Sequence, residues 1–317
     1  MAAPHLIVPF ASVLPEAALA AQRDLVLPNT SALLAALTES ARDSADELSL
    51  TPPHERALAR AIGLTGADGQ LPLAAVFAAR AGSGTTNEQA ASAWGLLTPA
   101  HWRLGTDQIG MTDPDALGLD EPMSRALLDA VRELFESEGF GLHYQHPTAW
   151  LATHPVLAGL PSASLDRVIG RNVDRWLPAD ANARLVRRLQ NEVQMLLYTH
   201  PINAEREGRG AVPVNSFWLS GCGAAAPFDW PASLQLDTSL RSSALNEDWF
   251  GWGRAWAALD AGPMATLLAS LRRGESVRLT LCGERAAVEF SAQPRGLMQR
   301  LRASISRPDL PALLGSL

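Results

Sequence analysis

The sequence predicts an α/β protein, in which helices cover a sheet built from strands that lie far apart along the chain. Three observations lead to this prediction. Short apolar runs alternate with amphipathic helical segments. The length of 317 residues allows one large core, or a core that carries an inserted domain. Hydrophobic residues make up 47% of the chain and charged residues 19%, which is typical of a folded rather than a disordered protein.

The first third of the chain is expected to contain one strand and three helices. A short apolar run predicts the strand, while prolines or capping residues followed by apolar stripes predict the helices. The strand is expected over residues 5–12, and the helices over 30–46, 52–62 and 71–80. A stretch rich in Gly, Ser and Thr, residues 81–89, follows them and marks the expected domain boundary.

In the remainder of the chain, two helices have the clearest patterns. Residues 121–138 combine an apolar stripe with Gly139 just beyond the end, and residues 182–198 place four apolar side chains on one face. A further helical segment is interrupted by Pro263. It covers residues 249–271, and extended segments are expected over 94–102, 108–112, 142–153, 212–219 and 277–282.

The charged and apolar residues exclude several classes of protein. The net charge of −7 and the lack of a basic block argue against a nucleic-acid partner. The sequence contains no lysine, which excludes a Schiff-base enzyme and a P-loop ATPase and leaves arginine as the only fixed cation. No apolar run approaches about 18 residues and no signal peptide is visible, so we expect no membrane contact and, with only two cysteines, a cytoplasmic location.

The densest polar segment, residues 190–223, predicts a helix, a polar loop, a strand and a glycine turn. Ligands of open α/β sheets bind beyond the carboxyl ends of strands, where a glycine turn allows close approach of the backbone and arginine forks can hold an anion. The alternative is a capped helix end with solvated arginines. The candidate ligand-binding residues are Asn191, Glu192, His200, Asn203, Arg206, Arg209, Asn215, Gly221, Cys222 and Gly223. Of these, we expect His200, Asn203, Arg206, Asn215 and the turn at Cys222 to face one cleft between core and inserted domain.

This segment resembles the archaeal-type, cofactor-independent phosphoglycerate mutases of the alkaline phosphatase superfamily, which carry a similar His-Pro-Ile/Val-Asn, Arg, Gly, Pro-x-Asn, Trp and Gly-x-Gly run. It is still more similar to a bacterial family labelled regulatory protein RpfE, through residues 191–197, His200-Pro201 and residues 218–223. Weaker similarity covers most of the chain. It includes Leu27-Pro28-Asn29-Thr30, the segment from Thr51 to Glu55 at the place of the mutases' nucleophile turn, and Gly69-Gln70-Leu71-Pro72.

The resemblance implies an alkaline-phosphatase-like, mostly parallel sheet with helices on both faces, and a smaller inserted α/β domain. The implied ranges are residues 1–88 for the first part of the core, 89–180 for the insertion and 181–317 for the second part of the core. It also implies that the strand ends at Leu6-Ile7-Val8 and at Leu279-Thr280-Leu281-Cys282 lie close together in one sheet.

The departures from the family concern its chemistry, which uses two divalent metals and a transiently phosphorylated serine. Where the family's first strand ends in a metal-binding Asp, this chain runs into Pro9-Phe10-Ala11. Pro53-His54-Glu55 replaces the serine turn, and no histidine follows His200. A two-metal site needs several carboxylate and imidazole ligands. We therefore expect no cofactor, no bound magnesium or manganese, and no phosphoglycerate mutase activity.

Three smaller groups of residues remain. His54 and Glu55, at an expected helix N-terminus, are candidate catalytic residues for a phosphohistidine mechanism, or else surface residues. His143 and His146 have a spacing that binds zinc on a helix, but on a strand it sends the rings to opposite faces. Cys222 and Cys282 are either two buried, inert residues or a thiol pair at one sheet edge, near Glu284.

The sequence thus favours a catalytically degenerate, phosphoglycerate mutase-like protein with a regulatory or ligand-sensing role and a small phosphorylated or carboxylated metabolite as its ligand. One alternative is an active, metal-independent phosphotransferase or phosphohydrolase that works through His54. Another is a protein-interaction module that uses the tryptophan-rich part of the chain, since all 9 tryptophans lie from Trp94 onward.

Overall fold

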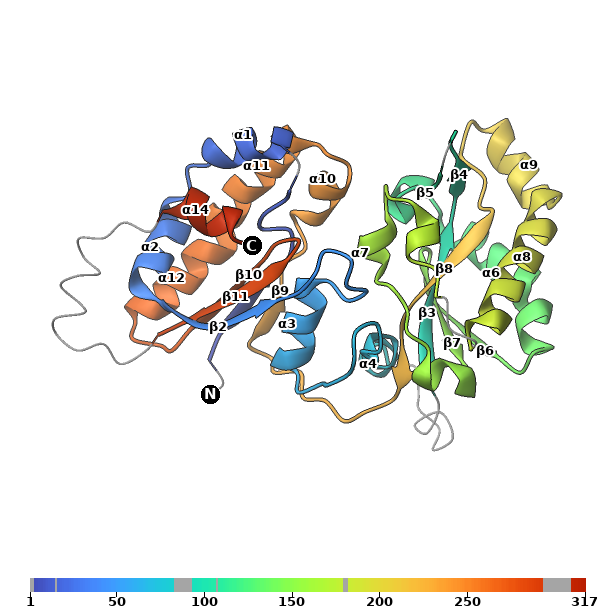
Figure 1. Ribbon diagram of the computed structural model, residues 1–317, viewed down its shortest axis with the longest axis horizontal. Helices are drawn as coiled ribbons and strands as arrows, with labels where there is room; N and C mark the ends of the chain where they lie inside the picture. Colours follow the sequence, from blue (N-terminus) through green and yellow to red (C-terminus); the bar gives the residue numbers. More distant parts are fainter. Residues whose placement is uncertain (1–2, 15, 83–92, 107, 179–181, 293–308) are drawn as a thin grey trace. The chain divides into compact units, whose positions relative to one another are not determined.

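The computed structural model describes residues 3–14, 16–82, 93–106, 108–178, 182–292 and 309–317. The chain forms two compact units (Figure 1). Unit 1 comprises Met1–Leu48, Pro52–Gly63 and Asp229–Leu317, and unit 2 comprises Ser49–Thr51 and Leu64–Phe228. The described residues 64–82 and 182–228, which the expected ranges assign to the core, are grouped with unit 2. Most of the expected boundary at 81–89 lies outside the described residues.

Unit 1 is built on a five-stranded mixed sheet in the order β2-β11-β10-β1-β9. β1 (His5–Val8) lies between β10 (Arg278–Cys282) and β9 (Leu234–Leu236) and is parallel to both. β11 (Ala286–Ser291) and β2 (Thr38–Ser44) extend the sheet with antiparallel pairings. The expectation of a mostly parallel sheet is therefore wrong. The connection between β10 and β11 is too short for a crossover, which forces an antiparallel hairpin.

The expected closeness of the two strand ends is confirmed. Leu6 pairs with Leu279 and Val8 pairs with Leu281, in parallel register. Both strands are short and apolar, as is usual for strands that are covered on both faces. Their carboxyl ends, together with that of β9, form one edge of the sheet, which we call the carboxyl edge.

Helices cover both faces of the unit 1 sheet. Leu6, Val8, Leu279 and Leu281 point to one face and pack in the main core of the unit with the buried rings of Trp252 and Trp256, among others. α3 (Pro53–Ala61) packs on β1, β10 and β11, and its start is formed by Pro53 as expected. The remaining helices are α1 (Glu16–Arg23), α2 (Pro28–Ala36), α10 (Arg241–Leu245), α11 (Trp249–Leu259), α12 (Ala265–Arg272) and α14 (Leu310–Gly315).

Two helical predictions in unit 1 need correction. The helix expected over residues 30–46 ends at Ala36, and the polar residues that follow form β2 instead. Pro263 does not stop its helix, because a π-helical turn over Asp260–Met264 connects α11 to α12. A π turn shifts the hydrogen-bond ladder by one residue and so accommodates a proline, which has no N–H to donate.

Unit 2 contains a four-stranded antiparallel sheet in the order β6-β7-β3-β8. The extended segment expected over 142–153 is a hairpin, because Pro147 and Thr148 form its turn. The strands are β6 (Gly141–His146), β7 (Ala149–Thr153), β3 (Ala93–Ala100) and β8 (Ser216–Ala224), and a separate ribbon joins β4 (Trp102–Leu104) to β5 (Ile109–Met111).

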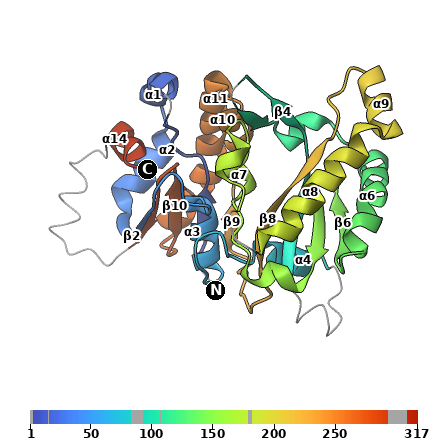
Figure 2. The same cartoon turned by 45° about the vertical axis from the view of Figure 1, so that its right-hand side comes forward.

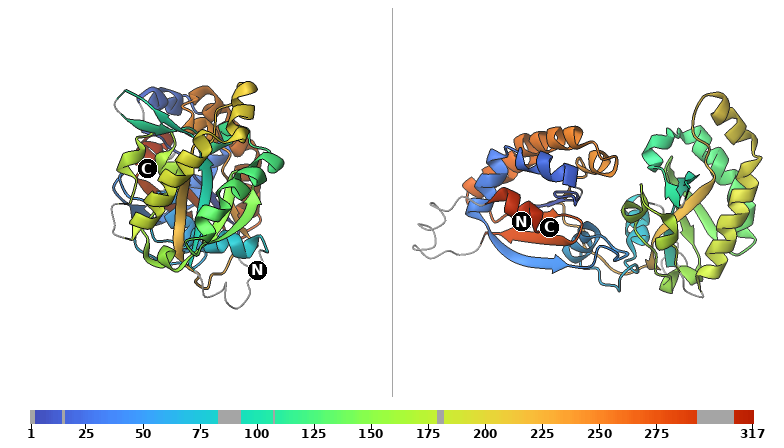
Figure 3. Two further views of the ribbon diagram at one scale, coloured as in Figure 1. Left: turned by 90° about the vertical axis from the view of Figure 1, so that its right-hand side faces the viewer. Right: turned by 45° about the horizontal axis from the view of Figure 1, so that its top comes forward.

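Helices also cover both faces of this sheet. α6 (Glu121–Glu136) and α8 (Ala183–Tyr198) pack side by side on one face and share its core (Figures 2 and 3). α4 (Leu73–Arg80) packs on β3 and β8 from the other face. The shorter helices are α7 (Leu165–Val168) and α9 (Pro201–Gly208), and 3-10 turns cover Pro114–Leu117, Pro155–Gly159 and Val173–Arg175. Within the described ranges, no helix has the length and apolarity that crossing a bilayer requires.

Candidate functional site

The carboxyl edge of the unit 1 sheet is the first candidate site. Beyond β1 the chain turns through Pro9, Phe10, Ala11 and Ser12, all of which are buried. Phe10 has a positive φ of 56°, which is rare for a bulky side chain and indicates a constrained turn. The turn is held from both sides: the Trp252 indole N–H donates to the Phe10 carbonyl at 2.9 Å, and the Ala11 N–H donates to the Cys282 carbonyl at 2.8 Å.

The two candidate catalytic residues lie in the first turn of α3. His54 is buried, with only 8% of its surface exposed, and its ring packs against that of Phe10 with 5.4 Å between the centroids. The interpretation of His54 as a surface residue is therefore wrong. Glu55 is half-buried in the same turn, where the positive end of the helix favours a carboxylate. The imidazole thus borders the carboxyl edge, where its ring contacts Phe10.

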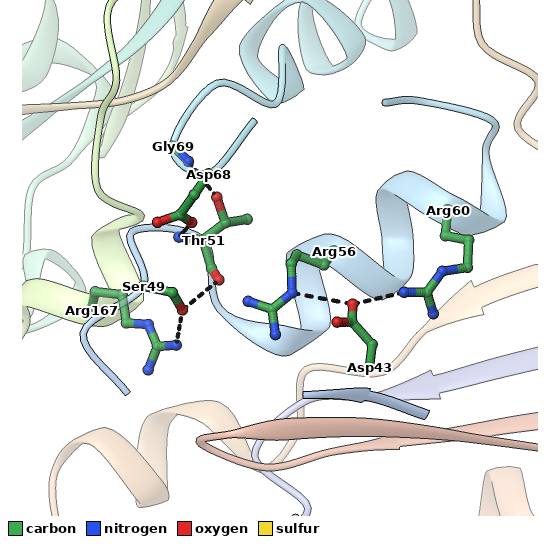
Figure 4. Close-up of polar contacts among 8 residues, drawn as sticks. All are labelled: Asp43, Ser49, Thr51, Arg56, Arg60, Asp68, Gly69 and Arg167. Carbon is green, nitrogen blue, oxygen red and sulfur yellow. Dashed lines mark hydrogen bonds and ion pairs between the residues drawn. The ribbon is translucent and has the colours of Figure 1, made fainter. Parts of the chain in front are cut away.

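Charged side chains of α3 and β2 lie near the end of β10. Arg56 and Arg60 both donate to one oxygen of Asp43, from Nε at 3.1 Å and from Nη2 at 2.7 Å (Figure 4). The three groups together carry one net positive charge. Burial raises the pKa of the Cys282 thiol; the charge of Arg56 acts in the opposite direction to a smaller extent. Cys282 is therefore a protonated thiol at neutral pH.

The last described residues cover the turn that follows Cys282. The Leu317 carbonyl accepts hydrogen bonds from the N–H groups of Arg285 at 2.9 Å and Ala286 at 2.6 Å. A Cβ atom placed on Gly283 would lie 2.6 Å from the Leu317 Cβ, so the turn requires glycine for this approach. Leu317 is buried in the main core of unit 1.

The residues of the carboxyl edge do not fit a pair of divalent cations. Such a pair carries four positive charges and prefers carboxylate and imidazole ligands. The edge offers the side chains of Pro9, Phe10 and Ala11, a protonated thiol, the bordering imidazole of His54 and two half-buried carboxylates, Glu284 and Asp237, which cannot balance four positive charges. Across the described ranges, no group of three or more His, Cys, Asp or Glu side chains is arranged to hold a metal ion.

The polar segment of residues 190–223 lies entirely in unit 2, where two of its three asparagines form hydrogen bonds with the backbone. The Asn203 amide donates to the carbonyls of Leu197 at 2.8 Å and Val214 at 2.7 Å, and its oxygen accepts from the Val214 N–H at 2.9 Å. Asn215 exchanges two hydrogen bonds with the main chain of Trp102, at 2.7 and 2.9 Å. The first asparagine therefore fixes the turn between α8 and α9, and the second fixes the start of β8 against β4.

Arg206 is also bound to backbone. Only 1% of its surface is exposed, and its guanidinium donates to the carbonyls of Val212 at 2.8 Å and Leu117 at 2.6 Å. Burial lowers its pKa, partly offset by the charge of Asp120. Arg209, one turn further on, is exposed and forms an ion pair with Glu205. Of the two arginines, Arg206 is the buried one, and its guanidinium already donates two hydrogen bonds to the backbone of unit 2.

The remaining polar candidates lie at helix surfaces and ends. His200 caps α9, and its Nδ1 accepts from the Ile202 N–H at 3.3 Å. Asn191 is exposed on α8, and Glu192 forms an ion pair with Arg188 on the same helix at 3.7 Å. The capped helix end that was the alternative interpretation is present at His200.

The glycine turn that the sequence predicts at residues 221–223 is part of a strand, because these residues lie within β8. The two glycines allow α4 to pack closely on that strand. A Cβ on Gly221, whose φ is +62°, would lie 3.0 Å from the Ala74 N atom, and one on Gly223 would lie 2.9 Å from the Pro72 Cβ. Cys222 is fully buried, and burial raises its pKa to about 12. It does not share a sheet edge with Cys282, because β8 and β10 belong to different sheets.

A polar cluster surrounds Thr51 in unit 2, and none of its residues was predicted as a site residue. The Asp68 carboxylate accepts hydrogen bonds from the N–H groups of Leu50 and Thr51, both at 2.8 Å, and the Thr51 hydroxyl accepts from the Gly69 N–H at 2.7 Å (Figure 4). Arg167, which is 2% exposed, donates to the Ser49 hydroxyl at 3.1 Å. The Asp-Gly pair at residues 68–69 could have predicted a turn at this cluster, because Asp and Gly favour turns in which side chains bond to backbone N–H groups.

His143 and His146 lie on a strand and not on a helix, so their spacing is not the helical one that binds zinc. His143 and His146 lie on β6, where a register shift separates them, and His154 caps the 3-10 turn that begins at Pro155. Burial lowers the pKa of both His143 and His154. In the described residues, these three rings do not come together in a metal-binding group.

Comparison with known proteins gives a distant relationship. No protein-family model matches the chain. A stretch of 119 residues, 36% of this chain, is 28% identical to the "Probable 2,3-bisphosphoglycerate-independent phosphoglycerate mutase" of Geobacter sulfurreducens, and it spans 29% of the length of that protein.

Two solved structures cover nearly the whole chain at low similarity. The cofactor-independent phosphoglycerate mutase from Thermoplasma acidophilum gives a TM-score of 0.37 with 13% identity over 93% of this chain and 91% of that one. The PH0037 protein from Pyrococcus horikoshii gives a TM-score of 0.42 with 10% identity over 98% and 97%. By its sequence match, the chain is a distant relative of cofactor-independent phosphoglycerate mutase.

Proposed function

We propose that the protein is a non-catalytic relative of the phosphoglycerate mutases that binds an anionic metabolite and acts as a regulatory or ligand-sensing protein, as in the RpfE-like family that it resembles. The observation that carries the proposal is the carboxyl edge of unit 1, which has too few carboxylates for two divalent metals. Phe10, with its positive φ, and the buried Cys282 stand where metal-dependent chemistry needs carboxylates. Function belongs to the site rather than to the fold, so a relative with a different site need not share the reaction.

Two arguments favour an anion as the ligand: the name of the matched relative and the positive charge of exposed arginine in unit 1. The matched relative is named for phosphoglycerate, which carries a phosphate and a carboxylate. In unit 1, Arg56 and Arg60 both form ion pairs with Asp43, and the Arg60 side chain reaches the surface, where a guanidinium attracts anions. Half of the Arg60 side chain is exposed, and arginine binds phosphate and carboxylate through paired N–H groups.

A cytoplasmic location is part of the same proposal. Both cysteines are free and buried, as is common in proteins of a reducing compartment.

The first experiment is a thermal-shift titration with 3-phosphoglycerate, 2-phosphoglycerate and inorganic phosphate. We expect the melting temperature to rise with the concentration of a phosphoglycerate, because a ligand that binds only the folded state stabilises it. Arg60→Gln is expected to weaken this binding by about tenfold, the effect of losing roughly 1.4 kcal/mol of a charge-assisted contact. Arg273→Gln is the matched control, since Arg273 is an exposed arginine paired with Glu275 in the same unit.

Enzyme assays distinguish the alternatives. Interconversion of the two phosphoglycerates with added manganese or magnesium, lost on chelation, would contradict the non-catalytic proposal. Metal-independent turnover that disappears in His54→Gln would instead support the phosphohistidine alternative. If no anion changes the melting temperature, the metabolite proposal fails and the protein-interaction alternative gains support.

A further inference from the structure

The outer face of α8 exposes two large apolar side chains beside two arginines. Tyr198 is 86% exposed and Met195 is 78% exposed. Together with the exposed residues Arg184, Arg188 and Asn191, they follow the spacing i, i+4, i+7, i+11 and i+14. At 3.6 residues per turn, these five side chains lie within about 80° of arc and form one stripe, which we call the α8 face. Single exposed apolar residues are ordinary, whereas neighbouring ones on one stripe indicate an interaction surface.

The composition of the α8 face is that of a protein interface. Arginine, tyrosine and methionine are enriched at interfaces, and tyrosine and arginine are frequent among the residues that contribute most to binding. The opposite side of the helix packs in the core of unit 2 through Val186, Leu189, Val193 and Leu197 (Figure 2). Solvent normally meets charged and polar residues on the outer side of such a helix, so the exposed tyrosine and methionine depart from the usual pattern.

Charge is distributed unevenly along the α8 face. Arg184 and Arg188 lie in its amino-terminal half, Met195 and Tyr198 lie in its carboxyl-terminal half, and Asn191 is at the midpoint. Two such faces in parallel would place Arg184 against Arg184, and the like charges would repel. Two antiparallel faces centred on Asn191 instead place each arginine-containing half against an uncharged half. The α8 face is therefore complementary to a second copy of itself about a twofold axis.

The antiparallel register also provides a specific contact at each end. Arg184 and Tyr198 lie seven positions on either side of Asn191, so Arg184 of each copy faces Tyr198 of the other. A guanidinium over a tyrosine ring is attracted by the π electrons of the ring. Unit 2 already contains one contact of this kind, in which the guanidinium carbon of Arg125 lies 3.9 Å from the ring centroid of Tyr144.

We propose that the α8 face is a homodimer interface, in which two copies of this chain pair antiparallel about a twofold axis at Asn191. α8 has 16 residues and is about 24 Å long. One helix face of this length buries less than the roughly 800 Å² per partner of a standard interface, so the expected dissociation constant is on the order of 10 µM. This inference rests on unit 2 and does not depend on the binding of a metabolite.

The experiment is sedimentation equilibrium of the full chain with two charge variants. Arg184→Glu and Tyr198→Arg should each weaken dimerisation by at least about tenfold, because the first removes both cation–π contacts and the second opposes two arginines at each end. An equimolar mixture of the two variants should regain dimers. The mixed dimer joins the new carboxylate to the new guanidinium at one end and keeps Arg184 against Tyr198 at the other.

The mixture makes the orientation testable, because residues 184 and 198 meet only in the antiparallel register. Leu104→Arg is the matched control, since Leu104 is 79% exposed in unit 2 and its replacement adds the same charge as Tyr198→Arg. This control should dimerise as the unchanged protein does. An unchanged protein that stays monomeric up to roughly 200 µM, a mixture no more dimeric than either variant alone, or equal weakening by Leu104→Arg would overturn the proposal.

Cross-linking tests the position of the twofold axis independently. Asn191→Cys places two thiols at the axis, where packed helices bring opposite Cα atoms close enough for a disulfide. Mild oxidation should therefore give a covalent dimer, and the native Cys222 and Cys282 do not compete because both are fully buried. Ala126→Cys, at an exposed position of α6, is the control. Equal rates of cross-linking for the two variants would contradict the proposed interface.

Discussion

Arg206 carries a charge into the interior of unit 2, and the groups that surround it are carbonyls. Its Nε and Nη2 bond to the carbonyls of Val212 and Leu117, and its Nη1 contacts the Met123 Sδ. Within the described ranges, no carboxylate forms an ion pair with it. A planar fork that reaches two carbonyls at once cannot be replaced by a point charge. Arg206 therefore ties α9 to the segments that precede α6 and β8.

Replacing Arg206 by Lys is expected to destabilise the protein by about 2–4 kcal/mol, because at least one buried carbonyl is left without a donor. Urea unfolding followed by circular dichroism measures the change. Arg209→Lys, on the same helix but exposed, should change stability by less than about 0.5 kcal/mol. A loss of ligand affinity in Arg206→Lys without a loss of stability would instead make Arg206 a ligand-binding residue.

His5 gives the protein a defined sensitivity to acid. Its Nε2 lies 2.8 Å from the Thr280 hydroxyl, and the side chain is 3% exposed. Burial, followed by the charge of Arg278, lowers its pKa from 6.5 to about 4, although a Glu289 oxygen lies 4.0 Å away. The folded state therefore keeps His5 neutral between pH 4 and 6.5, while the unfolded chain binds a proton there.

Because the unfolded state binds more protons in this window, stability falls as the pH decreases from 6.5 toward 4. The loss that His5 causes is on the order of 3 kcal/mol by pH 4, and it does not grow further below the folded pKa. His5→Gln removes the titration and keeps a polar group beside Thr280. The free energy of unfolding of this variant should fall less steeply over the window; identical slopes would contradict the pKa argument.

At the scale of elements, Asp260 links the start of α2 to the π turn between α11 and α12. Its carboxylate accepts hydrogen bonds from the Thr30 N–H and hydroxyl, both at 2.7 Å, and from the N–H and side-chain amide of Asn29, both at 3.2 Å. A carboxylate at a helix N-terminus both caps the helix and balances its dipole. This contact joins segments that are 230 residues apart in sequence.

Asp260→Asn is expected to destabilise the protein by about 1–3 kcal/mol, since an amide cannot accept at both of its polar atoms. In a double-mutant cycle with Thr30→Val, the two changes should be non-additive by at least about 0.5 kcal/mol, because the two residues are in contact. Thermal or urea unfolding of the four proteins measures the coupling. Asp129→Asn, an exposed residue paired with Arg132, serves as the control. Strict additivity would show that the contact does not form in solution.

The sequence predicted some elements and missed others for a physical reason. α6 and α8 were found because a single face of each is apolar, a pattern that local sequence contains. β2 was missed because six of its seven residues are polar or charged, and its extended form depends on pairing with β11, which lies about 245 residues later. The sequence analysis also missed β9, which has three residues, and β11, because their extended form depends on distant partners as well.

The candidate site shows the same limit. The paired ends of β1 and β10 were predicted correctly, because the family resemblance supplied the long-range pairing. Asn203, Asn215 and the glycines of β8 were predicted as ligand-binding residues, and the structure gives all of them backbone or packing contacts. A polar side chain that binds a ligand and one that fixes a turn have the same sequence signature, and only the position of its partners distinguishes them.

At the scale of the whole molecule, both units are discontinuous in sequence. Unit 1 is assembled from three segments, and the chain leaves and re-enters it twice between Leu48 and Asp229. Each unit nevertheless has its own core, around Trp252 and Trp256 in one and around Leu97 and Phe217 in the other. A substitution in one core should therefore affect the hydrogen exchange of its own unit first.

The position of β1 between β9 and β10 has a consequence for co-translational folding. His5–Val8 is translated long before both strands that flank it, which follow residue 233. At roughly 5–20 residues per second, the nascent chain waits tens of seconds for these partners. During this time an apolar strand with two unpaired edges is exposed, which is the form most prone to aggregate. Most of unit 2, Leu64–Phe228, emerges within the same interval and can fold first. Productive synthesis should therefore depend on chaperones that shield β1 until β9 and β10 have been translated.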